Sequence, residues 1–433
     1  MQGCVGARVL NAVLCGAAML TCAVRVDAQI PQPTERLTFA QAIERAVARN
    51  PNIMVAAAAV LRADALLAEA RSATLPQVNG SVTTTTLNAG VKFDDVVVSP
   101  RNSVTGTLDA RMGVYTPARW ASRAQAVEAR GVAELGADEA RRQTALATAD
   151  AFLAIIARRQ VVEANLRARD TAQAHFDLAT QQLQQGIGSR VNQLRAQQEL
   201  STDLGLVEAS ALLLYRAQEA LGVLVVADGP VDTLEEPAFD VPPESEQLDD
   251  PAALLLSRRD LKLFSGDVHL AERVLKDSSK DRLPVVDALF QPQVTYPSPF
   301  FTTTSSWRIL FQAAIPVYDS GFRSGLKLER QASLDASQAT LTGAVASARS
   351  EVRAARQGIA SALRGVESAR AGASQAQQVV EIVTFSFRAG AATNIEVIDA
   401  ERRARDADNA VAVAEHVLRT ARLGLLIALG RFP

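Results

Sequence analysis

The chain has 433 residues, with 45 lysines and arginines against 47 aspartates and glutamates, so its formal net charge is only −2. This balance argues against a nucleic-acid-binding protein. The three cysteines, Cys4, Cys15 and Cys22, all lie near the N-terminus, which excludes disulfides and cysteine-based metal sites from the rest of the chain. The sequence also lacks a phosphate-binding Gly-Lys-Ser/Thr loop and a His-Glu-x-x-His motif. We therefore expect a protein that is not an enzyme and carries no cofactor.

Residues 1–28 are predicted to form a secretory signal peptide. Arg8 supplies a positive start, residues 9–24 are mostly apolar, and Val26-Asp27-Ala28 is typical of a cleavage site. An alternative is a lipoprotein signal in which Cys22 is acylated. After this leader no apolar run approaches 18 residues, so no transmembrane helix is predicted.

The remaining chain contains two copies of one pattern, offset by about 208 residues. Leu75-Pro76 matches Leu283-Pro284, and Ala220-Leu221-Gly222 matches Ala428-Leu429-Gly430. Each copy is predicted as a helix, a β-hairpin and two long helices that are joined by a glycine turn. The first copy spans residues 29–227, with a helix over Thr38–Ala73, a hairpin at about 78–114 and long helices at about 117–226. A proline-rich, acidic linker (228–251) precedes the second copy (252–433), which has a first helix at 252–280, a hairpin at about 285–316 and long helices at about 321–430.

A seven-residue repeat runs along the long helix of the second copy. Val345, Val352, Ile359, Val366, Ala373, Val380 and Phe387 recur at this interval, with a second line three residues later, which is alanine at five of its six positions. A strict heptad pattern predicts left-handed coiling against a neighbouring helix. The glycines at 358, 365 and 372 form a further line that predicts close backbone packing. An ordinary alanine-rich bundle helix is the alternative interpretation.

The hairpins show the alternation of membrane strands. Val104, Leu108 and Met112 alternate with polar and charged residues, and Trp307, Ile309 and Phe311 do so in the second hairpin. Such strands of about ten residues are typical of an outer-membrane barrel, although a soluble sheet packed on helices also alternates. Four strands are too few to close a barrel, so the chain is expected to oligomerise, with eight strands from two copies or twelve from three.

The sequence resembles the TolC-like outer membrane factors of bacterial efflux and secretion systems. The resemblance rests on Leu37-Thr38-Phe39-Ala40-Gln41-Ala42-Ile43, on Val317-Tyr318-Asp319-Ser320-Gly321, and on residues 387–400 with the closing Ala428-Leu429-Gly430. It implies a mainly α-helical homotrimer with a twelve-stranded β-barrel in outer membrane lipid and a long α-helical barrel in the periplasm. The implied function is an exit duct that conducts substrates passively, and the implied partners are a periplasmic adaptor (membrane fusion) protein and an inner-membrane transporter.

The resemblance also implies a pore constriction at Glu396 and Asp399. These acids lie three residues apart, hence on one helix face, just after the expected tip turn at Gly390; Gly186 occupies the equivalent turn of the first copy. In a trimer each acid forms a ring of three carboxylates. The alternative is that acids at a helix N-terminus offset the helix dipole.

Other members of the family often hold this tip closed with a tyrosine before the turn and an arginine after it. Here those positions are Phe387 and Ala392, so Arg190 and Arg195 are the candidate partners of the acids.

Two further expectations follow from the residues. His175, His269 and His416 are far apart in sequence and lie in helical patterns, which favours helix-surface positions over a shared metal site. The alternative function is a soluble periplasmic coiled-coil scaffold or adaptor protein without a membrane barrel, whose hairpins pack on helices instead of lipid.

Overall fold

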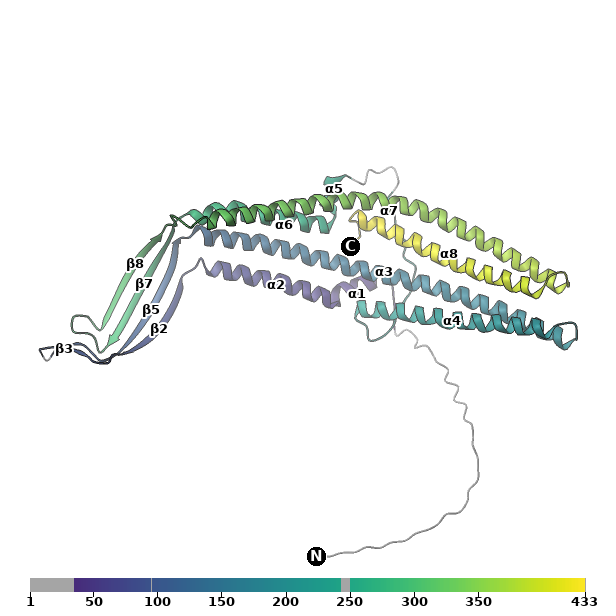
Figure 1. Ribbon diagram of the computed structural model, residues 1–433, viewed down its shortest axis with the longest axis horizontal. Helices are drawn as coiled ribbons and strands as arrows, with labels where there is room; N and C mark the ends of the chain where they lie inside the picture. The colour runs from purple at the N-terminus through teal and green to yellow at the C-terminus, as the bar shows by residue number, and fades with distance from the viewer. Residues whose placement is uncertain (1–34, 95, 243–249, 433) are drawn as a thin grey trace, which may run out of the picture.

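The computed structural model describes residues 35–94, 96–242 and 250–432. The predicted signal peptide and Cys22 therefore lie outside the described residues. The molecule is a long rod with its main strands at one end and paired helices that extend to the other (Figure 1). Helices α3 (Pro117–Gln184) and α7 (Phe322–Arg388) run along most of its length, and shorter helices lie beside them.

The first half of the chain contains one very long helix, α3, with α2 beside its N-terminal part and α4 beside its C-terminal part. Its elements are β1 (Glu35–Leu37), α1 (Phe39–Arg49), α2 (Pro51–Ser72), β2 (Gln77–Thr86), β3 (Val91–Phe93), β4 (Val96–Ser99), β5 (Asn102–Tyr115), α3 (Pro117–Gln184), α4 (Arg190–Val225) and β6 (Val231–Thr233). Thr38 caps α1 in a capping box with Gln41, as its sequence position predicts.

The structure divides the single helix expected from Thr38 to Ala73 at Asn50. The extended backbone of Asn50 ends α1, and its side chain accepts a hydrogen bond from the Asn52 N–H at 3.0 Å to begin α2. Pro51 follows at the first helical position, where its missing N–H costs nothing. A residue before proline is also disfavoured in helical geometry, which explains the break.

The second half repeats this arrangement, with α6 and α8 beside α7. Its elements are α5 (Pro251–Ser257), α6 (Arg259–Asp277), the short 3-10 helix η1 (Ser278–Arg282), β7 (Val285–Tyr296), β8 (Ser305–Ala314), α7 (Phe322–Arg388) and α8 (Asn394–Ala428). The helix expected over 252–280 is thus split at Arg258. The guanidinium of this residue is buried and pairs with Asp260 and Glu351, both at 2.6 Å.

The four main strands form one antiparallel sheet in the order β2-β5-β7-β8, while β3 and β4 pair separately and β1 pairs with β6 in parallel. Cross-strand partners share a face, and one face carries most of the apolar side chains, as in the row Val78, Ala110, Phe290 and Ile309. The charged residues lie on the other face, where Arg111 binds Asp287 at 3.0 Å. The predicted alternation is therefore present across all four strands.

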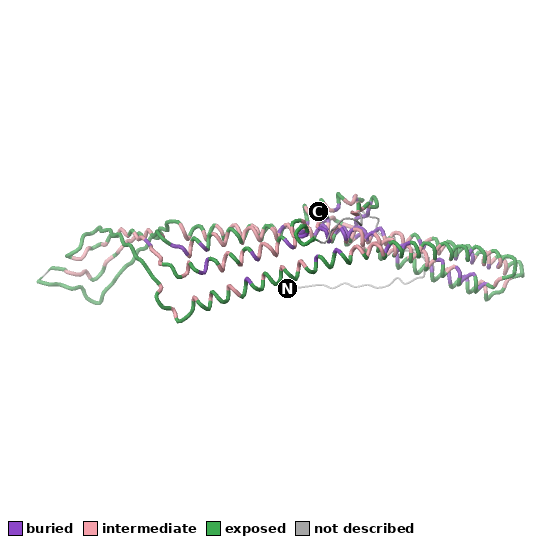
Figure 2. Tube along the Cα trace, turned by 90° about the horizontal axis from the view of Figure 1, so that it is seen from above, coloured by how far each residue is buried: buried purple, intermediate pink, exposed green. Residues whose placement is uncertain are grey.

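Buried side chains gather midway along the rod, whereas both ends are more exposed (Figure 2). The larger cluster includes Phe152, Leu153, Leu221, Val225 and Leu423, and so joins α3 and α4 to the last helix of the chain. A second cluster joins α5, α6, α7 and the C-terminal part of α8. The larger cluster therefore joins the two halves of the chain at the centre of the rod.

The heptad line of α7 faces neighbours within the same chain. Val352, Val366, Val380 and Phe387 are buried, and the other residues of the line are partly buried against α6 or α8. The glycine line behaves differently, since a Cβ built at Gly358, Gly365 or Gly372 meets no atom within 4 Å. The expected close packing at these glycines is therefore absent within a single chain.

Candidate functional site

The candidate site is the helical end of the rod, where the α3–α4 loop and the α7–α8 loop lie near each other (Figure 1). Gly186 lies in the α3–α4 loop with φ 76°, and Gly390 lies in the α7–α8 loop with φ 77°. Both values belong to the left-handed backbone conformation, which favours glycine. Both loops turn the chain back on itself. The sequence-predicted tip residues therefore occupy equivalent positions in the two copies.

Glu396 lies in the first turn of α8 and is bound to the helix cap. Its carboxylate accepts a hydrogen bond from the Thr393 N–H at 2.7 Å, and the Thr393 hydroxyl accepts one from the Glu396 N–H at 3.4 Å. The backbone N–H of Thr393 and then its hydroxyl lower the pKa of Glu396, so this exposed side chain is ionised at neutral pH. It therefore both caps α8 and presents a negative charge at the tip.

Asp399 lies one turn further along α8 and pairs with Arg403 on the same helix at 2.9 Å. Both side chains are exposed. Arg190 binds Gln193 on its own helix, and Arg195 is exposed. Within the described parts of one chain, no ion pair joins either of these arginines to Glu396 or Asp399.

The sequence analysis did not predict a buried polar contact near the tip. His175 of α3 is 5% exposed, contrary to the expected surface position, and its Nε2 lies 2.7 Å from Oδ1 of Asn394, the first residue of α8. Asn394 donates in turn to the carbonyl of Asn192 on α4 at 3.4 Å, and the ring of Phe387 lies against the imidazole. The two helical hairpins are thus joined by the neutral imidazole with its proton on Nε2.

Burial lowers the pKa of His175, while the hydrogen bond to Asn394 partly opposes this shift. Because the folded pKa is below the unfolded value, the folded protein has its full stability above about pH 6.5. It loses stability as the pH falls below this value, since protonation then places a charge on a buried ring. We expect His175→Ala to lower the free energy of unfolding by about 1–3 kcal/mol, since the buried amide of Asn394 loses its partner. Thermal unfolding between pH 5 and 8 measures both effects.

The exposed His269 of α6 provides the control for this prediction. His269→Ala is expected to leave both the stability and its decline towards pH 5 unchanged. An equal loss of stability in the two variants would contradict the role assigned to His175.

Ion pairs also join α4 to α8 further from the tip. Arg402 binds Glu199 through Nε at 2.8 and 2.9 Å, and Arg405 binds Asp203 at 2.7 Å. Glu199 and Asp203 are almost fully buried. No sequence motif reveals these pairs, because they depend on how two helices from different copies of the repeat align.

Comparison with known proteins assigns the chain to a family. The sequence profile of the outer membrane efflux protein family matches residues 42–225 and 255–431, which is most of the chain. The chain belongs to the outer membrane efflux protein family. No curated protein matches it by sequence.

Three solved structures illustrate the fold of this efflux protein. The outer membrane protein VceC of Vibrio cholerae is 17% identical, with a TM-score of 0.76 over 90% of this chain and 96% of VceC. The outer-membrane channel OprN is 18% identical, with a TM-score of 0.78 over 90% and 89%. The outer membrane channel MtrE of Neisseria gonorrhoeae, solved in an open state, is 17% identical, with a TM-score of 0.72 over 90% and 88%. At these identities the likeness establishes a shared fold.

Family membership identifies the protein as an outer membrane efflux channel with a large helical periplasmic part. Among the described residues, no helix combines the length and the apolar character needed to cross a membrane. The same residues contain no cluster of three histidine, cysteine, aspartate or glutamate side chains suited to a metal ion.

Proposed function

We propose that three copies of this efflux protein form one passive exit duct, which receives substrates from a periplasmic adaptor and an inner-membrane transporter. Such a duct serves a tripartite efflux or a type I secretion system. The chain contributes one third of a twelve-stranded barrel and one third of a helical tunnel. Energy for transport comes from the partner pump, since the duct itself offers only a path.

The observation that carries this proposal is the open sheet. Strands β2 and β8 are its two edges, and neither has a second partner in the described chain. Lipid cannot satisfy unpaired backbone groups, so these edges need strands from other copies. Twelve strands enclose a pore, whereas eight leave an interior that side chains fill.

Helix α2 supports the same assembly. It has no buried residue in the single chain, and the apolar side chains Met54, Val55 and Leu61 are 69%, 70% and 70% exposed. An exposed apolar surface of this kind is typical of a contact with another protein. The glycine line of α7 leaves similar open space beside the helix.

The soluble scaffold or adaptor is not favoured by these observations. A scaffold would cover the apolar face of the sheet with helices, yet Val82, Trp307 and Phe311 are 77%, 68% and 74% exposed. Family membership also places the protein in the outer membrane.

We propose that the four-stranded sheet lies in the membrane and that the helical tips lie at the periplasmic end. Glu396 and Asp399 form the constriction of the pore at these tips. In a trimer each contributes three carboxylates around one axis, which attracts cations and narrows the path. Arg190 and Arg195 remain proposed partners of these acids between neighbouring copies, because they are not paired with them inside one chain. Gly186 and Gly390 supply the turns that place both hairpins at this ring.

Cysteine cross-linking tests the assembly, since residues 29–433 contain no cysteine of their own. A chain that carries one cysteine on β2 and one on β8 is expected to form disulfides between copies, with dimers and trimers on a denaturing gel and no larger species. The purified protein is expected to form long-lived pores in planar bilayers. Cysteines on β5 and β7, which pair within the chain, serve as the control. Cross-links that stop at dimers, or bilayers without pores, would contradict the trimeric duct.

A further inference from the structure

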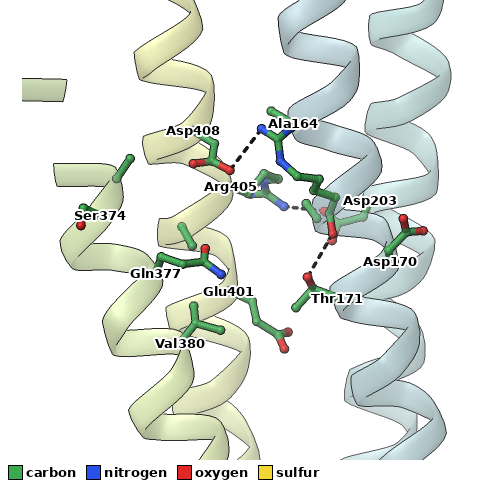
Figure 3. Close-up of a pocket in the computed structure, with 14 residues that line it drawn as sticks. Ala164, Asp170, Thr171, Asp203, Ser374, Gln377, Val380, Glu401, Arg405 and Asp408 are labelled. Carbon is green, nitrogen blue, oxygen red and sulfur yellow. Dashed lines mark hydrogen bonds and ion pairs between the residues drawn. The ribbon is translucent and has the colours of Figure 1, made fainter. Parts of the chain in front are cut away.

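A cavity of about 600 Å³ lies where α3, α4, α7 and α8 meet, above the tip of the rod (Figure 3). Asp203 enters it from α4, and Glu401 and Arg405 enter it from α8. The apolar contact within the second hairpin is close by, where Val380 of α7 packs against Ala400 and Ala404 of α8. At this level of the rod the contact between the two hairpins is therefore polar, while the contact within the second hairpin is apolar.

The acids of this region outnumber their basic partners. Glu199, Asp203 and Glu401 are three neighbouring carboxylates, and the nearby guanidinium groups are those of Arg402 and Arg405. Arg402 is held by Glu199, and Arg405 lies 2.7 Å from Asp203 and 3.5 Å from Glu199. Both arginines are thus committed to the two acids of α4, which leaves Glu401 without a basic partner.

The excess of acids affects the protonation of Glu401. Its Oε2 is buried and has no hydrogen-bond partner. Burial, together with the negative charges of Glu199 and Asp203, raises the pKa of Glu401 to about 8. The side chain therefore holds a proton at neutral pH.

The remaining charged groups around the cavity do not neutralise an ionised Glu401. From α3, Arg167 lies 3.6 Å from Asp408, and Asp170 pairs with the neighbouring Arg169 at 2.5 Å. The α7 wall is uncharged, with Ser374 and Gln377 as its polar members. An additional negative charge on Glu401 is thus poorly compensated from any of the four helices.

We propose that Glu401 is a proton-binding site that controls the contact between the two helical hairpins at the periplasmic end. When it is protonated, α8 rests against α3 and α4. When it loses its proton, three carboxylates repel one another across this contact, and the hairpin tips separate. This proton switch would regulate the duct proposed above, so its role in transport rests on that proposal. The separation of the hairpin tips itself does not require a working channel.

The direction of the pH dependence follows from proton linkage. An acid that is protonated in the packed state and ionises more readily when exposed favours packing at low pH. The contact therefore weakens as the pH rises from the ordinary glutamate pKa near 4.3 towards 8. If separation exposes Glu401 fully, the equilibrium constant for separation rises by up to about tenfold per pH unit in this range.

Spin labels on both tips test this proposal in the full-length protein. Ile187 and Ala391 are exposed residues of the α3–α4 and α7–α8 loops, and each is replaced by a labelled cysteine. Co-expression with excess unlabelled chain keeps labelled copies apart in any assembly. Distances measured by electron paramagnetic resonance between pH 6.5 and 9, where His175 is neutral, are expected to show a growing separated population, by up to about tenfold per pH unit below pH 8.

Three additional substitutions in the labelled protein decide the assignment. Glu401→Gln is expected to abolish the rise of the separated population with pH. Asp203→Asn is expected to move this rise to lower pH, because a repelling charge is lost and Arg405 is freed. Glu208→Gln removes an exposed acid of α4 and is expected to leave the curve unchanged. An unaltered curve in Glu401→Gln, an unaltered curve in Asp203→Asn, or constant distances in the labelled parent would each overturn the proposal. Failure of the bilayer experiment alone would contradict the duct and not this switch.

Discussion

Replacement of Phe152 by alanine is expected to lower the free energy of unfolding by about 3–5 kcal/mol. Phe152 of α3 has no exposed surface, and its ring packs edge-on against Phe39 of α1 at a centroid distance of 5.3 Å. Phe39 also contacts Phe239 of the linker at 5.6 Å. The variant leaves a cavity in the cluster that joins both halves of the chain, and this cluster relaxes little because helices surround it.

Denaturant titration of the solubilised protein, followed by circular dichroism, measures this loss. Phe385→Ala is the matched control, since it removes the same side chain from α7 at a position that is 73% exposed in the single chain. We expect a small effect from the control. Equal losses in the two variants would show that Phe152 does not anchor the central core.

The combined substitution of Glu396→Gln and Asp399→Asn is expected to raise single-channel conductance and to weaken block by multivalent cations. The physical reason is the loss of two carboxylates per chain from the proposed constriction. Glutamine at position 396 can still accept the Thr393 N–H, so the capping box persists while the charge is removed. Conductance and block in planar bilayers give the measurement.

Glu396→Ala separates the two roles of this residue. It removes both the charge and the cap, so any fraying of α8 that it causes is absent from Glu396→Gln. Glu381→Gln, which neutralises an exposed acid of α7, is the charge control. Unchanged conductance and unchanged cation block in the double variant would remove Glu396 and Asp399 from the proposed gate.

Local patterns explain why much of the architecture follows from the sequence. The alternation in β5 and β8 and the heptad line of α7 are repeated over many residues, so each fixes the type and the apolar face of its element. The glycines at 186 and 390 mark the tip turns because few other residues adopt their backbone geometry. These signals were sufficient to predict the doubled order of elements and the resemblance to outer membrane channels.

The sequence reasoning failed where the outcome depends on contacts between distant elements. It placed His175 on the surface, yet this side chain is buried against Asn394, which follows it by 219 positions. The break at Asn50 was also missed, although the following proline was a usable signal. The charges of Glu199, Asp203 and Glu401 gave no signal, since a helix pattern does not reveal its lateral register against another helix.

The sequence by itself determined the repeat, the strand alternation and the apolar seams, because these are periodic properties of single elements. Only the tertiary structure decided which helices the seams meet and which acids share two arginines. It also showed that Glu396 caps its own helix. Such contacts form between side chains far apart in the chain, where a shift of one helical turn would pair different residues.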